Sequence, residues 1–476
     1  MSRLALPTSA PAYHRSWVNE RVGLRAGAVV VALLFAGLIG VAGAATDGKL
    51  LFGGAVALGY LALVYRSLAA GLALFTSLTF YDLAAAALGD GLTFSKLGGA
   101  VLALFWLLMI ASRGNRVPLI FRDVPRLAFG VCALMTWALA SILWAPDPLL
   151  ASSDAFRLVQ GLILIFVTYT AIRERRHFRW VMAAFVGGAL LAALFGILGS
   201  AEGGNGRITG GFDDPNELAA VIVPGGVFAA FAFFAYRGQR VRWLFLACLP
   251  VFLVALVDTD SQGGLVALAV GVVASVVVGG PLRGKAALFA VLSIGSAIFY
   301  YTAVTTPNGL TEGRGSREDL WKVALAVSAD HPVAGVGAGN FSVVEPSYAL
   351  ANIPLARADL ITRGYVAHNS YLHVLAEFGA VGLALFVGVI VSSLVLALRA
   401  VHTFSRARDR QMEILTRGLI AGACSLLAAY FFASAQYEKQ LWLVIGVAAG
   451  THALASRIES SGTAAARHRG RPARVN

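Results

Sequence analysis

The feature that most constrains this chain is the regular alternation of long apolar runs with short charged segments. Of its 476 residues, 58% are hydrophobic and only 13% are charged. The runs approach the length of about 20 residues with which a helix crosses roughly 30 Å of hydrocarbon. A membrane β-barrel would instead alternate apolar and polar residues within short segments, and no such pattern is evident. The sequence therefore predicts an all-α, polytopic integral membrane protein.

The apolar runs predict about 12–14 transmembrane helices. The candidate spans are 22–45, 50–65, 68–88, 92–111, 127–144, 154–172, 178–199, 217–236, 243–257, 262–279, 285–304, 370–398, 414–434 and 439–455. The chain then divides into a cytoplasmic tail (1–21), a transmembrane region (22–304), a large helical extracytoplasmic loop (305–369), C-terminal transmembrane helices (370–455) and a basic cytoplasmic tail (456–476).

The distribution of charge predicts the orientation. Segments 113–126, 173–179, 237–242, 283–285 and 406–410 are basic, whereas the intervening loops carry mainly aspartates, as in 211–217. Because short cytoplasmic loops collect Lys and Arg, both termini are predicted to be cytoplasmic. The net charge of +13 is thus an orientation signal. Basic residues spread over many short segments do not form a nucleic-acid footprint.

The long outer loop contains the stretch "GRGSREDLWKVALAVSADHPVAGVGAGNF". Its pattern predicts a short amphipathic helix with Ser316 as the N-cap and a stop at His331 and Pro332. The following "GVGAGN" comes after a helix instead of a strand and lacks the full dinucleotide-binding pattern, so it predicts a tight turn against the membrane surface.

Several outer residues have two interpretations. Arg207, Arg314, Arg317 and Arg363 are either solvated loop arginines or the ligands of a diphosphate, since guanidinium groups near a helix N-terminus favour anions. His368, which precedes Asn369 where the loop re-enters the membrane, is either a capping or interfacial residue or a catalytic base.

Other polar residues suggest weaker hypotheses. His373 and Glu377 would not share a helix face with His368, so no metal triad is implied. Asp258 and Asp260 resemble a two-carboxylate metal site, but such short acidic patterns are common, and no cofactor is predicted. Charged residues within spans are costly to bury and deserve a functional hypothesis; these are Asp82, Lys96 and Arg157.

Three segments together resemble the bacterial O-antigen ligase and polymerase family. "HNSYLHVLAEFGAVG" is similar to the family's motif of His, a polar residue and a glycine at fixed spacing. "SREDLWKVALAVSADHPVAGVGAGNF" resembles its Arg-x3-Trp helix and glycine turn, and "RITGGFDDPNELA" its Pro-Asn segment. The resemblance covers roughly residues 200 to 400.

The resemblance implies a fold of the type C glycosyltransferase class. It also implies transfer of a whole glycan from undecaprenyl diphosphate to an acceptor hydroxyl on the outer side of the membrane. The acceptor would be lipid A core, a second lipid-linked glycan or a protein hydroxyl. His368 takes the place of the general base and Arg317 that of a donor-binding arginine, while Asn216 and Asn369 fall within the matching motifs.

One position departs from the family pattern. Gln262 stands where family members often have an arginine, so donor binding would rely on Arg317 and Arg207. Two other functions remain open from the sequence. A transporter or lipid-linked glycan flippase would fit the number of spans, although paired repeats are not evident. A protein O-oligosaccharyltransferase would differ only in its acceptor.

Overall fold

A computed structural model of the chain describes residues 49–81, 94–112, 120–199, 206–212, 214–280, 284, 312–352 and 365–469, and this part contains helices and no strands. The predicted spans 22–45 and 285–304 lie outside these residues, as do Asp82 and Arg363.

Seven helices of the described part are long and apolar enough to cross a membrane. They are α7 with the short η2 (Pro125–Leu143), α8 (Pro148–Ala171), α9 (Arg175–Leu198), α10 (Pro215–Ala235), α17 (Ser370–Arg406), α18 (Arg410–Ala429) and α19 (Lys439–Arg469, apolar over Lys439–Ser460). The other helices are α2 (Lys49–Arg66), α3 (Leu68–Leu78), η1 (Thr79–Tyr81), α5 (Phe94–Ser112), α6 (Ile120–Asp123), α11 (Arg242–Asp258), α12 (Gln262–Val278), α14 (Glu312–Asp330) and α15 (Phe341–Asn352). This all-helical, multi-pass architecture confirms the predicted fold class.

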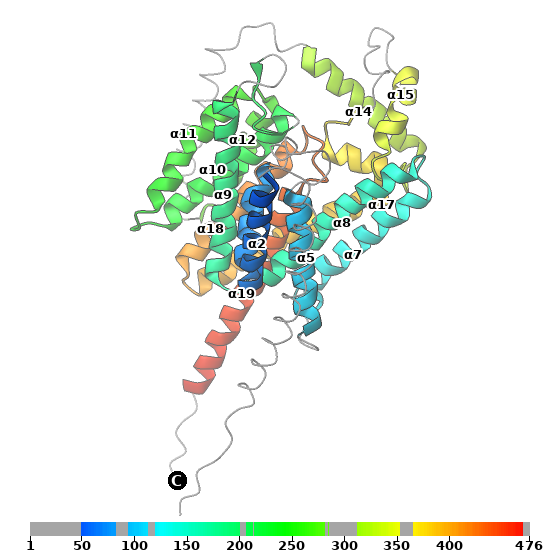
Figure 1. The fold of residues 1–476 in the computed structure, drawn as a ribbon. Helices are drawn as coiled ribbons and strands as arrows, with labels where there is room; N and C mark the ends of the chain where they lie inside the picture. Colours follow the sequence, from blue (N-terminus) through cyan, green and yellow to red (C-terminus); the bar gives the residue numbers. More distant parts are fainter. Residues whose placement is uncertain are drawn as a thin grey trace, which may run out of the picture.

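The membrane helices pack through small side chains and a few large aromatic ones. α18 lies along α10 and α12, and α19 lies along α8 and α17 (Figure 1). Ala229 and Ala421 are fully buried, and such small residues let helix backbones approach closely. Trp442 of α19 is fully buried as well, and its Nε1 donates to the Gln436 carbonyl at 3.2 Å. The polar end of its indole is thus satisfied inside an apolar core.

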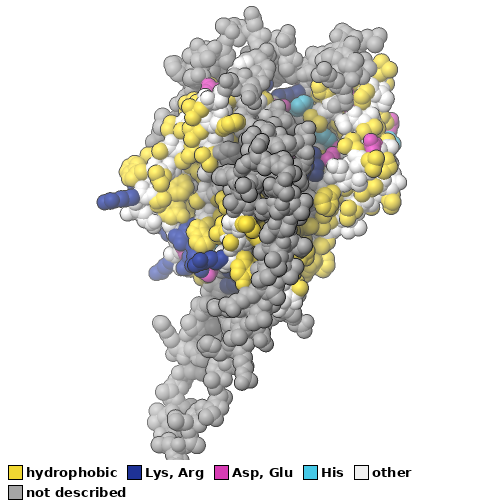
Figure 2. Space-filling model, in the orientation of Figure 1, with side chains coloured by type: hydrophobic (Ala, Val, Ile, Leu, Met, Phe, Trp, Pro, Cys, Tyr) yellow, Lys and Arg dark blue, Asp and Glu magenta, His cyan; other side chains and the backbone are white. Residues whose placement is uncertain are grey.

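The loops gather at two opposite ends of the bundle. At one end, an ion pair of 2.6 Å between Arg175 and Asp409 joins the start of α9 to the α17–α18 loop. At the other end, the Ile208 amide donates to the Asp258 carbonyl, and the Ser370 amide to the Tyr430 carbonyl. Lys and Arg side chains cluster below a broad hydrophobic belt in Figure 2. These contacts tie neighbouring loops together at each end of the bundle.

The outer loop forms a small helical layer with its own core. α14 and α15 enclose Leu320, Val327 and Phe341, and Ala376 of α17 closes this small core on the side of the membrane helices. The glycine turn between them docks on α17, because the amides of Val336 and Gly337 donate to the carbonyls of Ala376 and Glu377 at 2.9 and 2.8 Å.

Docking of this turn depends on a kink in α17 at Gly379. Its φ of 66° and ψ of −170° are non-helical and lie where a side chain is strained. A Cβ at this position would also collide with the Val333 carbonyl. The family motif's glycine therefore has a physical role, which is to let the outer loop cross the helix.

The structure corrects three local predictions. Helix α14 begins at Glu312, so Ser316 lies inside it and is not the N-cap. Helix α17 continues past residue 398 to Arg406, because polar residues extend a helix beyond the apolar run. Arg157 is not a buried charge: its side chain is 53% exposed and forms a 3.3 Å ion pair with Asp154 near the outer end of α8.

Candidate active site

His368 lies at the mouth of the bundle, immediately before α17. Its φ of 46° is in the left-handed region, which non-glycine residues adopt only where the surroundings hold them. Asn369 caps α17 through Oδ1, which accepts from the amides of Tyr371 and Leu372 at 3.0 and 3.1 Å. Ser370 Oγ donates to the Ala433 carbonyl at 2.7 Å. The residues that follow His368 are thus fixed, and its unusual backbone is held in place.

The His368 imidazole faces an aspartate from another helix. His368 Nδ1 lies 3.7 Å from Asp214 Oδ2, and each side chain is 27% exposed. Asp214 is the N-cap of α10, and its Oδ1 accepts from the Asn216 amide at 2.7 Å. One carboxylate oxygen therefore positions the helix while the other faces the histidine, as a group that orients a catalytic imidazole would do.

The electrostatic surroundings keep His368 neutral. Burial lowers the pKa of His368 below its usual 6.5, the Asp214 carboxylate opposes this shift, and the neighbouring Arg317 and His373 add to it. The imidazole is therefore unprotonated at neutral pH. A neutral imidazole can accept a proton from a hydroxyl, which is the property that a general base requires.

Polar side chains link the starts of α10 and α12 beside this pair. Ser261 Oγ donates to Asn216 Oδ1 at 2.7 Å and accepts from the Gly264 amide at 3.0 Å, so it caps α12 and joins the two helices. Asn216 Nδ2 in turn donates to Asp214 Oδ1. Gln262 is the first residue of α12 and is exposed. Asn216 therefore acts in the structure as a buried link between Asp214 and Ser261.

Two arginines, Arg207 and Arg317, lie near the pair of His368 and Asp214. Arg207 Nε donates to the Thr259 carbonyl at 2.8 Å and Nη2 to the Asp260 carbonyl at 3.3 Å, which leaves other N–H groups of this fork available. Arg317 of α14 is half-buried and has no hydrogen bond or ion pair with any described residue.

The charges of these arginines act on each other. Burial lowers the pKa of Arg317, the Asp214 carboxylate opposes the shift, and the positive charge of Arg207 adds to it. Two guanidinium groups near one carboxylate, one of them without a hydrogen bond or ion pair to the described residues, form a site with spare positive charge. Such a fork matches the oxygen atoms of a phosphate or diphosphate.

Two buried hydrogen-bond donors near the site have no partner among the described residues. They are Asn369 Nδ2, next to His368, and Trp321 Nε1, one helical turn after Arg317. The Trp321 ring packs edge-on against Phe431, with ring centroids 5.4 Å apart. Unsatisfied buried donors are costly, so their presence at a polar opening is typical of a ligand site.

The other predicted residues are placed as follows. Arg314 lies on α14 one turn before Arg317, and its side chain is not among those described. Asp258 ends α11, and Asp260 follows with a left-handed φ of 46°. The described residues contain no group of three His, Cys, Asp or Glu side chains arranged to hold a metal ion.

A second polar network lies deeper in α17. His373 Nε2 is 3.0 Å from Glu377 Oε1, and Tyr437 Oη donates to Glu377 Oε2. Glu377 is fully buried, and His373 Nδ1 is 3.0 Å from Ser434 Oγ. These groups satisfy one another and brace the 430–438 segment against α17. The network is separate from the pair of His368 and Asp214, as the helical spacing predicts.

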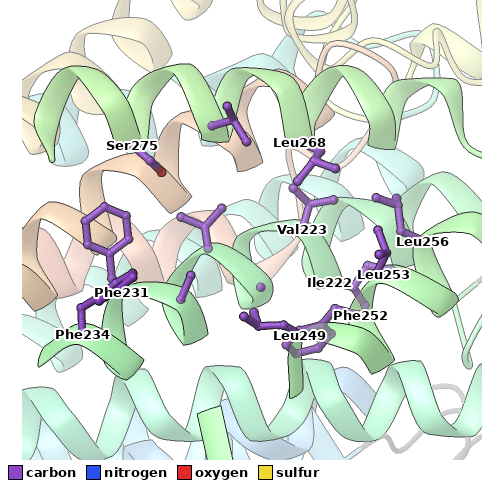
Figure 3. Close-up of a pocket in the computed structure, with 14 residues that line it drawn as sticks. Ile222, Val223, Phe231, Phe234, Leu249, Phe252, Leu253, Leu256, Leu268 and Ser275 are labelled. Carbon is purple, nitrogen blue, oxygen red and sulfur yellow. The ribbon is translucent and has the colours of Figure 1, made fainter. Parts of the chain in front are cut away.

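An apolar groove between α10, α11 and α12 extends from the polar site into the membrane region. Figure 3 shows it with Ser275 toward one end and Leu256 toward the other. Leu256 lies close to the polar site, because its carbonyl accepts a hydrogen bond from Thr259 Oγ1 and the Thr259 carbonyl accepts from Arg207. The lining is otherwise composed of aliphatic and phenylalanine side chains. Such a groove suits a hydrocarbon chain.

Sequence reasoning missed the roles of Asp214, Ser261 and Trp321. A local signal existed for the first two. Asp214 precedes Pro215, the pattern of an N-cap followed by proline at the first helical position, and Ser261 likewise precedes α12. The signal predicts helix starts, whereas the meeting of Asp214 with His368 depends on how α10 and α17 pack.

Residues 246–387 match the sequence profile of the O-Antigen ligase family. The matched range contains Gln262, Arg317, His368 and Gly379, whereas Arg207 and Asp214 precede it. The resemblance seen in the sequence motifs is therefore confirmed. No curated protein matches the chain.

Proposed function

We propose that this chain, whose residues 246–387 match the O-antigen ligase family, is a membrane glycosyltransferase that moves a glycan as one block from undecaprenyl diphosphate to an acceptor hydroxyl. The reaction would take place on the outer side of a bacterial cytoplasmic membrane, which is the side that the charge pattern assigns to His368. Such an enzyme is a ligase or a polymerase of surface polysaccharide, according to its acceptor.

The observation that carries this proposal is the convergence of three kinds of group at one opening. A neutral histidine, His368, faces an orienting carboxylate, and two arginines, Arg207 and Arg317, stand beside them. The apolar groove of Figure 3 reaches Leu256, and Thr259 connects this residue to Arg207 by two hydrogen bonds. A polyprenyl diphosphate glycan has the matching parts, since its lipid fits an apolar groove and its diphosphate fits a pair of guanidinium groups.

The chemical step would be displacement at the anomeric carbon. The acceptor oxygen forms a bond to this carbon while the bond from the carbon to the diphosphate oxygen breaks. His368 takes the proton of the acceptor hydroxyl, and its imidazolium is stabilised by Asp214. Nδ1 faces Asp214, so Nε2 is the nitrogen left to meet the acceptor. Direct displacement of this kind would invert the configuration of the transferred sugar.

The arginines would stabilise the leaving group. Negative charge grows on the diphosphate as the bond to the sugar breaks, and preorganised donors are most effective where charge develops. Arg317 makes no hydrogen bond to the described part of the chain, whereas Arg207 is held by the carbonyls of Thr259 and Asp260 and offers its remaining N–H groups. Asn369 Nδ2, beside His368, and Trp321 Nε1, one helical turn after Arg317, are further buried donors without a partner among the described residues.

Reconstitution tests the proposal. The purified protein in proteoliposomes, supplied with an undecaprenyl diphosphate-linked glycan and an acceptor, is expected to form the glycosylated acceptor and release undecaprenyl diphosphate. The acceptor should gain the mass of the whole glycan. Movement of the donor across the bilayer without any transfer would contradict the proposal and indicate a flippase.

A further inference from the structure

A second cavity lies at the opposite end of the bundle from His368. It has a volume of about 330 Å³ and opens between the start of α7 and the second half of α17. The side chains of Arg126 and Arg399 line it together with Val391, Val395 and Leu396 of α17 and Leu127 of α7. The cavity therefore combines two cationic groups with an apolar wall.

The depth of these side chains follows from the geometry of the two helices. α7 reaches the His368 end at Ser141, whose Oγ accepts from the Ala338 amide of the glycine turn, so its first turn lies at the other end. Along α17, about 20 residues separate Gly379 from Arg399, which corresponds to about 30 Å, the thickness of the hydrocarbon layer. Arg126 and Arg399 therefore lie at headgroup depth in the opposite leaflet.

Valines extend from this position toward the bilayer centre. Val391, Val395 and Arg399 are spaced by four residues, so they share one face of α17. Val391 and Val395 are 51% and 38% exposed in the protein alone. At 1.5 Å per residue, Val391 lies about 12 Å deeper than Arg399, at the level of acyl chains.

The two guanidinium groups are available to a ligand as far as the described residues show. Neither Arg126 nor Arg399 makes a hydrogen bond or ion pair with any described residue. Asp123 also lines the cavity, and its Oδ2 accepts from Tyr169 Oη at 2.7 Å. The charges of Arg399 and Asp123 both reach His452 of α19, whose Nδ1 is buried without a partner. The cavity thus has net positive charge and an unused polar atom near it.

We propose that this cavity binds an anionic phospholipid of the leaflet opposite the His368 end. The lipid phosphate would lie between Arg126 and Arg399, and an acyl chain would follow Val395 and Val391. Basic pockets between transmembrane helices that meet an apolar wall have the chemistry of such headgroup sites. The proposal is independent of glycan transfer, because the cavity shares no residue with the site at His368.

Native mass spectrometry of the full-length protein tests this proposal, with dioleoyl phosphatidylglycerol and dioleoyl phosphatidylcholine as probes. Phosphatidylglycerol is expected to be retained more tightly than phosphatidylcholine. Arg126→Gln and Arg399→Gln are each expected to weaken its retention about fivefold, since one basic side chain near a lipid headgroup contributes about that factor. Val395→Phe, which fills the groove and keeps both charges, is expected to weaken it as well.

The matched control removes one positive charge at the same end of the protein but outside the cavity. Arg237→Gln and Arg240→Gln alter two exposed arginines in the turn between α10 and α11, and retention should be unchanged. All these positions are on the surface, and circular dichroism verifies that the helices are intact. Equal retention of the two lipids, or unchanged retention in both arginine variants of the cavity, would overturn the proposal.

Discussion

The most discriminating single substitution is Arg317→Lys, which keeps the positive charge and removes the planar fork. Arg317 is half-buried and makes no hydrogen bond or ion pair with the residues that the structure describes, and Asp214 and Arg207 are close enough to change its pKa. A lysine in its place offers a point charge that cannot make two parallel hydrogen bonds to one phosphate group. The prediction therefore separates recognition by shape from attraction by charge.

The expected loss follows from one charge-assisted hydrogen bond. Such a bond is worth about 1.5–3 kcal/mol, which corresponds to roughly a 10- to 150-fold decrease in kcat/KM. Because the bond strengthens as the diphosphate gains charge, we expect most of the decrease in kcat instead of KM. Arg207 remains in place and accounts for residual activity.

The assay is transfer of a labelled glycan from its polyprenyl diphosphate carrier in proteoliposomes, followed under steady-state conditions. Arg157→Lys is the matched control, because Arg157 lies on an outer helix end and is 53% exposed. It should transfer at the wild-type rate. An Arg317→Lys variant within threefold of wild type would refute the idea that a guanidinium fork holds the diphosphate.

Three further predictions concern the base, the kink and the groove. Asp214→Asn removes the carboxylate that raises the pKa of His368, so the acid limb of the pH–rate profile should move to lower pH while the rate falls; a move to higher pH would contradict this. Gly379→Ala should lower the free energy of unfolding by at least about 2 kcal/mol in thermal unfolding, because the residue needs a left-handed φ and has no room for a Cβ. The control Gly388→Ala should leave the free energy of unfolding unchanged, because a Cβ at that position meets open space. Ala230→Trp in the groove should raise KM for a long-chain polyprenyl donor and leave a short-chain analogue unaffected; equal effects on both donors would exclude a lipid role for the groove.

The membrane helices could be predicted from the sequence because hydrophobic length and charge alternation reflect the bilayer directly. Helix α12 begins at Gln262 and α19 at Lys439, as expected. The extension of α17 to Arg406 was missed, since an apolar run marks the hydrocarbon layer and not the end of the helix. The start of α14 was misplaced because Ser316 is only one of several residues there with capping chemistry, Thr311 being another.

The candidate site could be predicted only in part. The sequence indicated His368, Arg317, Arg207 and Asn369 through their place in the outer loops and the family motifs. It did not indicate that Asp214 lies opposite His368, because this contact joins residues more than 150 positions apart and depends on tertiary packing. The left-handed backbone of His368 likewise results from the caps and hydrogen bonds that follow it.

The most direct test of the central claim is single-turnover transfer by the His368→Ala variant. If His368 is the general base, we expect the rate of transfer to decrease about 10²–10⁴-fold, with donor binding retained, because only proton removal is lost. His331→Ala, an exposed histidine at the end of α14, serves as the control and should match wild type. A His368→Ala variant that is correctly folded in the membrane and transfers glycan at the wild-type rate would contradict the account.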